Sequence, residues 1–155
     1  MTLKVGSAAP PLSYAAADGT PRTLAELRGH KAAVVYFYPA DFTSVCTRET
    51  CGFRDIYGEL ASADVEVIGV SVDDPERHRE FAEAYQIPFA LVSDPNLEIA
   101  RAWGATGLIS TLARKTKRVT YVVDKAGTIA GVFEGMFSAS HHVDGVRARI
   151  AELPR

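Results

Sequence analysis

The order of hydrophobic segments along the 155-residue chain predicts an α/β fold, with a central mixed sheet flanked by helices. Five segments rich in β-branched and aromatic residues alternate with segments of helical periodicity. The first of these segments lack polar alternation, which is typical of parallel strands covered on both faces. A tight turn joins the last two, which predicts a C-terminal antiparallel hairpin.

The predicted strands are residues 32–38, 65–72, 89–92, 118–124 and 128–133. Pro39 ends the first strand, because proline lacks the N–H group that a strand ladder requires. Residues 125–127 form the turn of the hairpin. The pair Asp18 and Gly19, which follows three alanines, predicts a further turn.

Two long segments have the periodicity of helices that bury one face. Apolar residues recur at spacings of three and four as Phe53, Ile56, Tyr57 and Leu60, and again as Val143, Val146, Ile150 and Leu153. Ser140 is the predicted N-cap of the last helix. Asp74 is a second predicted N-cap, with Pro75 at the first helical position. Trp103 is expected to pack a short helix near residues 99–102.

The composition excludes several classes of protein. Hydrophobic residues make up 47% of the chain and charged residues 23%, as in ordinary globular proteins, and the length predicts one domain over residues 1–155. The net charge of −2 argues against a nucleic-acid partner. The longest mainly apolar stretch, residues 31–40, is too short to cross a membrane, and residues 1–7 lack the apolar core of a secretory signal. We therefore expect a cytoplasmic protein with no membrane partner.

The two cysteines, Cys46 and Cys51, are the strongest chemical signal. In a cytoplasmic chain of this size they are more typical of reactive or metal-binding groups than of a structural disulfide. Cys46 lies where the chain enters a predicted helix, and the unpaired N–H groups and dipole at such a position favour a thiolate. An inert buried cysteine is an equal alternative from these residues alone.

Cys51 follows five residues later, which leaves a metal site, a redox pair or a buried helix residue as alternatives. Zinc sites use shorter cysteine spacings and need two further ligands. The adjacent His141 and His142 diverge on a helix, and no third cysteine exists, so a metal is disfavoured. No Cys-x-x-Cys motif is present, which argues against disulfide exchange as the main activity. The chain also shows no catalytic triad arrangement and no glycine-rich phosphate loop.

The stretch around Cys46 resembles the peroxiredoxins of the alkyl hydroperoxide reductase/thiol-specific antioxidant family. Pro39, Thr43 and Cys46 match the family pattern Pro-x-x-x-Thr-x-x-Cys in identity and spacing. A second cysteine five positions later resembles the bacterioferritin-comigratory, or Q-type, subgroup. The chain departs from this subgroup at residues 44–45, where Ser-Val replaces the frequent Pro-Gly. The resemblance continues in order through Asp18-Gly19, Gly69-Val70-Ser71, residues 89–94 and residues 118–127.

This resemblance implies a thioredoxin-like fold and a thiol peroxidase without metal or other cofactor. Cys46 would be the peroxidatic cysteine, oxidised to a sulfenic acid. Cys51 would be the resolving cysteine that forms an intramolecular disulfide with it. Arg118 would hold the thiolate and the peroxide with its rigid fork of donors. The Thr43 hydroxyl would bind a peroxide oxygen, and Pro39 would limit the access of water to the sulfur.

Glu49 is expected to orient Arg118 or to cap the first helical turn. Without the resemblance, Arg118 would be interpreted as a solvated member of the basic run 114–118. Thr43 would equally be an ordinary loop threonine or a helix cap.

The resemblance further implies an antioxidant role, with hydrogen peroxide and small alkyl hydroperoxides as substrates. Thioredoxin or a glutaredoxin-type protein would be the reductant, and the protein would be a monomer or a homodimer. The alternatives are a thiol–disulfide oxidoreductase and a redox-regulated binding module on the same fold. A Cys-x-x-Cys pair would favour the first, and binding alone does not require Thr43 and Arg118 around Cys46.

Overall fold

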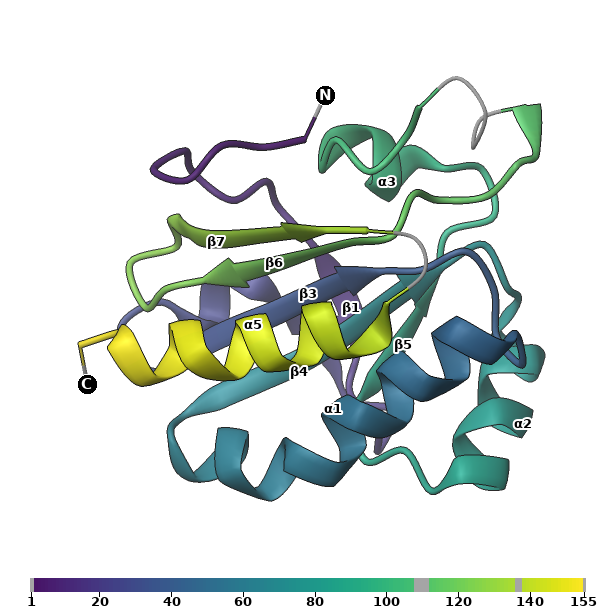
Figure 1. Cartoon of the computed structure of the whole chain (residues 1–155), viewed down its shortest axis with the longest axis horizontal. Coiled ribbons are helices and arrows are strands. Elements are labelled where there is room, and N and C mark those ends of the chain that lie inside the picture. Colours follow the sequence, from purple (N-terminus) through teal and green to yellow (C-terminus); the bar gives the residue numbers. More distant parts are fainter. Residues whose placement is uncertain (1, 108–111, 136–137, 155) are drawn as a thin grey trace.

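A five-stranded mixed sheet forms the centre of the computed structural model, which describes residues 2–107, 112–135 and 138–154 (Figure 1). The strands, in the spatial order β5-β4-β3-β6-β7, are β3 (Ala32–Phe37), β4 (Val65–Ser71), β5 (Ala90–Ser93), β6 (Val119–Val123) and β7 (Ile129–Glu134). β3 pairs with β4, and β4 with β5, in parallel. β6 is antiparallel to both β3 and β7. The predicted mixed sheet with its C-terminal hairpin is confirmed.

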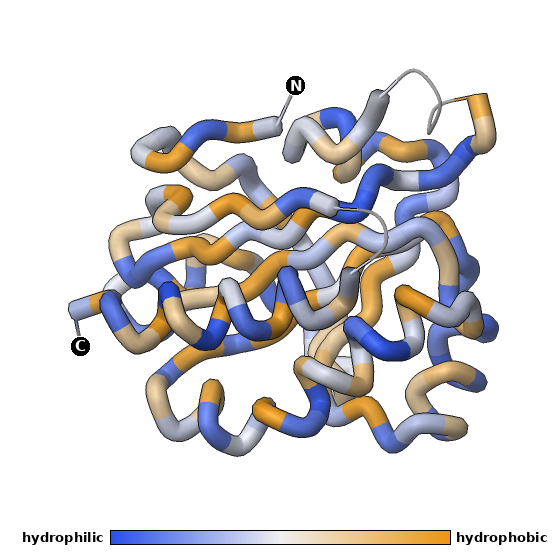
Figure 2. Tube along the Cα trace, in the orientation of Figure 1, coloured by the Kyte–Doolittle hydropathy of each residue, from blue (hydrophilic) through white to orange (hydrophobic). Residues whose placement is uncertain are grey.

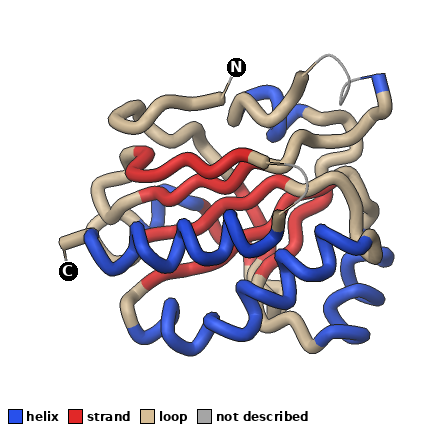
Figure 3. The backbone as a smooth tube through the Cα atoms, viewed as in Figure 1, coloured by secondary structure: helices blue, strands red, loops and turns tan. Residues whose placement is uncertain are grey.

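Helices cover both faces of this sheet (Figure 3). The helices are α1 (Ser44–Ser62), α2 (Pro75–Tyr85), α3 (Glu98–Ala102), α5 (Ala139–Glu152) and the 3-10 helix η1 (Leu24–Leu27). α1 and α5 lie side by side on one face (Figure 1). α3 and η1 contribute to the core on the opposite face. The Cys46 segment therefore lies between the sheet and solvent on the α1 side.

Two hydrophobic cores explain why β3 shows no polar alternation. Val34 and Tyr36 point into the core beneath α1 and α5, whereas Val35 and Phe37 point into the other core. All six residues of β3 are buried. The hydrophobic residues follow the central strands in Figure 2, in agreement with this burial.

Gly52 lets α1 and α5 approach closely. A Cβ atom at this position would lie 2.8 Å from Cγ2 of Val143, which is closer than carbon atoms pack. The apolar face predicted for the last helix is confirmed, because Val143, Val146 and Ile150 belong to the core shared with α1. This contact fixes which side of α5 faces the sheet and α1.

Three details differ from the sequence-based expectations or add to them. The predicted turn at residues 18–19 joins two unpredicted strands, β1 (Ser13–Ala15) and β2 (Pro21–Thr23), which are too short to show a period. The N-cap of α5 is Ser138, whose hydroxyl accepts from the His141 N–H at 3.2 Å, so the expectation of Ser140 was wrong. Asp74 is confirmed as the N-cap of α2. Among the described residues we find no helix with the length and hydrophobicity to cross a membrane.

Candidate active site

Cys46 lies in the first turn of α1, as the sequence predicts. The helix starts at Ser44, directly after its N-cap residue Thr43, and the first helical hydrogen bond runs from the Thr47 N–H to the Thr43 carbonyl at 2.8 Å. The side chain of Cys46 is fully buried. The thiol therefore lies at the positive end of a long helix dipole and is shielded from water, two conditions that strengthen electrostatic interactions with it.

Arg118 contacts the sulfur from a position 72 residues away in the chain. It directly precedes β6, and its Nη2 donates to Sγ of Cys46 at 2.9 Å. Only 4% of its surface is exposed, whereas Arg114 and Lys115 of the same basic run are exposed. Arg118 is therefore a buried cation and not a solvated member of that run.

The second arm of the Arg118 guanidinium binds a buried carboxyl group. Its Nη1 donates to Oε1 of Glu49 at 2.7 Å. Glu49 lies one helical turn after Cys46 and therefore on the same face of α1. Of the two roles expected for Glu49, the contacts match the one that orients Arg118.

Two further residues surround Glu49 that sequence reasoning missed. The Thr120 hydroxyl on β6 lies 3.4 Å from Oε2 of Glu49 and 2.7 Å from Nδ1 of His142 on α5. Nε2 of His142 lies 2.8 Å from the carbonyl oxygen of Gly135. His142 is completely buried, whereas its neighbour His141 is exposed. No signal in the sequence distinguishes two adjacent histidines in this way.

Burial shifts the pKa values of this group in opposite directions. It raises the pKa of Glu49 to about 7, although the nearby Arg118 lowers it. It lowers the pKa of His142 to about 4. Glu49 and His142 lie 3.3 Å apart, within ion-pair distance. Because burial keeps the imidazole uncharged, this contact near neutral pH is a contact between hydrogen-bonding groups and not a salt bridge.

Thr43 and Pro39 lie in the loop that leads into α1. Pro39 is half-buried, and Thr43 is exposed at the N-cap position. The Thr43 hydroxyl donates to the carbonyl of Ala40 at 2.8 Å and makes no capping bond. Phe42 between them has a left-handed backbone, with φ of 63°. The structure thus places both residues beside the start of the helix, with the Thr43 hydrogen bond within the loop.

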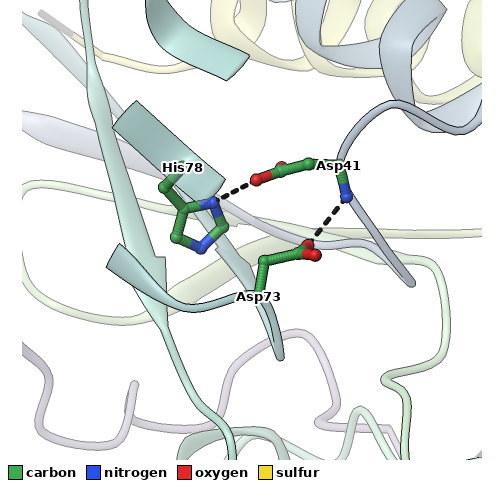
Figure 4. A group of neighbouring side chains, drawn as sticks. All are labelled: Asp41, Asp73 and His78. Carbon is green, nitrogen blue, oxygen red and sulfur yellow. Dashed lines mark hydrogen bonds and ion pairs between the residues drawn. The ribbon is translucent and has the colours of Figure 1, made fainter. Parts of the chain in front are cut away.

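A buried polar network anchors this loop to β4 and α2 (Figure 4). Asp41 accepts from the Tyr38 hydroxyl at 2.5 Å and pairs with Nδ1 of His78 at 2.6 Å. The Asp41 N–H donates to Asp73 at 2.7 Å, and Asp73 also accepts from Ser71 at 2.6 Å. The sequence analysis identified none of these contacts, which join residues far apart in the chain.

Asp41, Asp73 and His78 are also the one group of described residues whose ligand atoms lie within 4.8 Å of one another, as a metal site requires. Each of these side chains already has a hydrogen-bonding partner within the network. Buried polar groups satisfied in this way rigidify the segments they join. We therefore interpret the cluster as an anchor for the loop before Cys46.

Cys51 lies on the next turn of α1, half-buried. It borders a shallow surface hollow between α1 and α5, which is also lined by Arg48, Val143 and Asp144. Burial raises the pKa of the Cys51 thiol. Both cysteines are free thiols in this structure, so the described state is the reduced one.

The fold and the site define a class of protein, the peroxiredoxins with a thioredoxin-like fold. The sequence model of the AhpC/TSA family matches residues 5–132, and the chain belongs to this family. The expected fold class and family are confirmed.

Relatives with curated names support the subgroup. The chain is 43% identical to chloroplastic peroxiredoxin Q of Gentiana triflora over 140 residues, which are 90% of this chain and 63% of that protein. It is 41% identical to chloroplastic peroxiredoxin Q of Sedum lineare, with 90% and 73% covered. The chain thus spans about two thirds of the length of these relatives.

Solved structures match nearly the whole chain. Peroxidoxin BcpB from Mycobacterium tuberculosis has a TM-score of 0.86 at 31% identity, with 99% of each chain covered. The bacterioferritin comigratory protein of Xanthomonas campestris, described for its alkyl peroxide reduction activity, has a TM-score of 0.83 at 26% identity, with 100% of each chain covered.

Proposed function

We propose that this chain is a thiol-dependent peroxidase, an oxidoreductase that reduces hydrogen peroxide and small alkyl hydroperoxides through Cys46. The observation that carries the proposal is the 2.9 Å contact between Arg118 and the buried Cys46 sulfur at the start of α1. A permanent cation and a helix N-terminus both favour the thiolate, which is the reactive form of cysteine. The family and the similar solved structures support the same activity.

In the first step the Cys46 thiolate attacks the terminal oxygen of the hydroperoxide. An S–O bond forms, the O–O bond breaks, and the sulfur is oxidised to a sulfenic acid. The electron pair of the O–O bond leaves with the alkoxide, or with hydroxide when the substrate is hydrogen peroxide, and this group takes up a proton. Negative charge moves from sulfur to oxygen, so the preset donors of Arg118 stabilise the transition state. The Thr43 hydroxyl and the half-buried Pro39 would complete the binding site for the peroxide.

In the second step Cys51 resolves the sulfenic acid. Its sulfur attacks Cys46, an S–S bond forms, and water leaves. A dithiol protein of the thioredoxin or glutaredoxin type then reduces the disulfide by thiol–disulfide exchange. The proximity of both cysteines on one helix supports this pairing, and the exposed hollow beside Cys51 gives a reductant access.

We further propose that residues 1–155 act as one domain in this reaction, as a monomer or a homodimer with an antioxidant role. The cytoplasm stays a prediction from the sequence, since the plant relatives are named as chloroplastic.

Thiol counting and mass measurement test the proposed function. One equivalent of hydrogen peroxide is added to the reduced protein, and free thiols and intact mass are then measured. We expect the loss of both thiols and of about 2 Da, the mass of the two hydrogens lost when a disulfide forms. The Cys51→Ser variant should lose one thiol and gain one oxygen, and Cys46→Ser should not react. Retention of both thiols in the wild-type protein would refute the proposal.

A further inference from the structure

The hydrogen bonds behind Arg118 determine where protons must lie. Nε2 of His142 is 2.8 Å from the Gly135 carbonyl oxygen, which only accepts hydrogen bonds. Nε2 therefore carries a hydrogen. A neutral imidazole has one N–H group, so Nδ1 of a neutral His142 is an acceptor. Its partner at 2.7 Å, the Thr120 hydroxyl, must then be the donor.

This direction leaves Glu49 facing two acceptors. The Thr120 hydroxyl has only one hydrogen, and His142 takes it. Oε2 of Glu49 then lies 3.4 Å from an oxygen and 3.3 Å from a nitrogen that both present lone pairs. An ionised carboxylate in this position would face these lone pairs with no donor to Oε2 among the described residues. A carboxylic acid would donate to one of them and satisfy the whole chain of hydrogen bonds.

The other consistent arrangement places the same proton on His142. A doubly protonated imidazole would donate from Nδ1, and Glu49 would then be ionised. Both arrangements hold one proton more than an ionised Glu49 beside a neutral His142. Burial separates them, because it raises the pKa of Glu49 and lowers that of His142. The proton therefore lies on Glu49.

Other charged and titratable groups around this pair agree with that placement. Arg118 contacts Oε1 from the segment before β6, and Cys46 shares the helix face with Glu49. From β3 the Tyr36 side chain interacts with Glu49, and burial keeps the pKa of this phenol well above its usual value, so it is neutral. On α5 the neighbouring His141 disfavours a positive charge on His142.

We infer that Glu49 is protonated in the reduced protein, and that His142 is a positioning residue which keeps it so by holding the Thr120 hydroxyl hydrogen. The inference rests on the proposed function for its consequence. With Glu49 neutral, the Arg118 cation faces one anion, the Cys46 thiolate. When Glu49 ionises, a second buried anion competes for the same guanidinium.

Two substitutions of His142 separate its two hydrogen bonds. In His142→Asn the amide places an acceptor where Nδ1 was, so the contact to Thr120 is kept. In His142→Gln the longer amide reaches the position of Nε2 and keeps the bond to Gly135, but the acceptor for Thr120 is lost. The Thr120 hydroxyl is then free to donate to the Glu49 carboxylate, and such a bond favours ionisation by about one to two pH units.

The first readout is the titration of Glu49 by carbon NMR on protein labelled at the glutamate carboxyl groups, with Glu49→Gln for assignment. We expect the wild-type carboxyl to titrate near pH 7. We expect His142→Asn to titrate near the wild-type pH, and His142→Gln to titrate about one unit lower or more. A wild-type titration at the pH of an exposed glutamate would overturn the inference without any variant. Equal shifts in the two variants would also overturn it.

The second readout is the rate constant of hydrogen peroxide reduction against pH. The rate constant per thiolate should fall roughly tenfold as pH rises through the Glu49 titration, because an added buried anion weakens the Arg118 field. This fall should move to lower pH in His142→Gln and not in His142→Asn. A fall at the same pH in all three proteins would overturn the positioning role. Absence of peroxide reduction in the wild-type protein would refute the proposed function, while the NMR titration would still decide the position of the proton.

Discussion

Formation of the Cys46–Cys51 disulfide is expected to unwind the first two turns of α1. Both residues lie on one regular helix, Ser44–Ser62, five positions apart. Five helical residues differ by roughly 7.5 Å in rise and about 140° in direction. The Cα atoms of a disulfide lie about 4.4–6.8 Å apart, with their Cβ atoms pointing toward each other. The bond therefore cannot close while this part of the helix is intact.

The structure allows the cost of unwinding to be estimated. Three contacts are lost with these turns: the Thr47–Thr43 helical bond at 2.8 Å, the bond from the Tyr36 hydroxyl to Thr50 at 3.0 Å, and the Arg118–Glu49 pair at 2.7 Å. A neutral bond contributes about 1 kcal/mol and a charge-assisted one about twice that. Removal of Cys46 from the core costs about 1 kcal/mol more.

Closure of so short a loop restores only roughly 2 kcal/mol through the unfolded state. The oxidised protein should therefore be less stable by roughly 3 kcal/mol. For a chain of this length, the thermal midpoint should fall by about 6–12 °C.

Amide hydrogen exchange resolves the expected unfolding. Residues 44–52 should be protected in the reduced protein and exchange rapidly in the oxidised one, while β3 and β4 keep their protection. The Cys51→Ser variant is the matched control, because peroxide oxidises its Cys46 without closing a disulfide, so its helix should stay protected. If the wild-type protein lost both thiols and still showed the exchange pattern of the reduced form, either the helix or the role of Cys51 would be incorrectly assigned.

Three further predictions concern the charges of the site. Arg118→Lys should lower the rate constant with peroxide about 100-fold in stopped-flow measurements, because lysine lacks the planar pair of donors, whereas Lys117→Arg should have no effect; a rate within threefold of wild type would remove Arg118 from the reaction. Iodoacetamide should alkylate Cys46 at lower pH than Cys51, since burial raises the pKa of Cys51, and equal profiles would oppose this. Glu49 binds its proton more tightly when folded, with a pKa of about 7, so its contribution to stability is present at low pH and lost as pH rises through 7. Glu49→Gln should therefore gain up to about 3 kcal/mol over the wild type between pH 5 and 8 in urea unfolding, and a constant difference would contradict this.

The sequence by itself determined the strands and the start of the catalytic helix. These features are local: β3 is an uninterrupted apolar run that ends at Pro39, and Asp74 caps α2 within its own turn. Cys46 could be placed near a helix N-terminus for the same reason. Arg118 was identified only through the resemblance to a family, because its position in a basic run predicts a solvated side chain.

The tertiary structure decided which side chains surround the sulfur. His141 and His142 are chemically identical in the sequence, and only the contact of α5 with Gly52 of α1 turns His142 into the core. The pairing of Asp41 with His78 likewise joins residues 37 positions apart. Such contacts depend on the relative placement of separate elements, which is set by packing over the sheet and leaves no periodic signal along the chain.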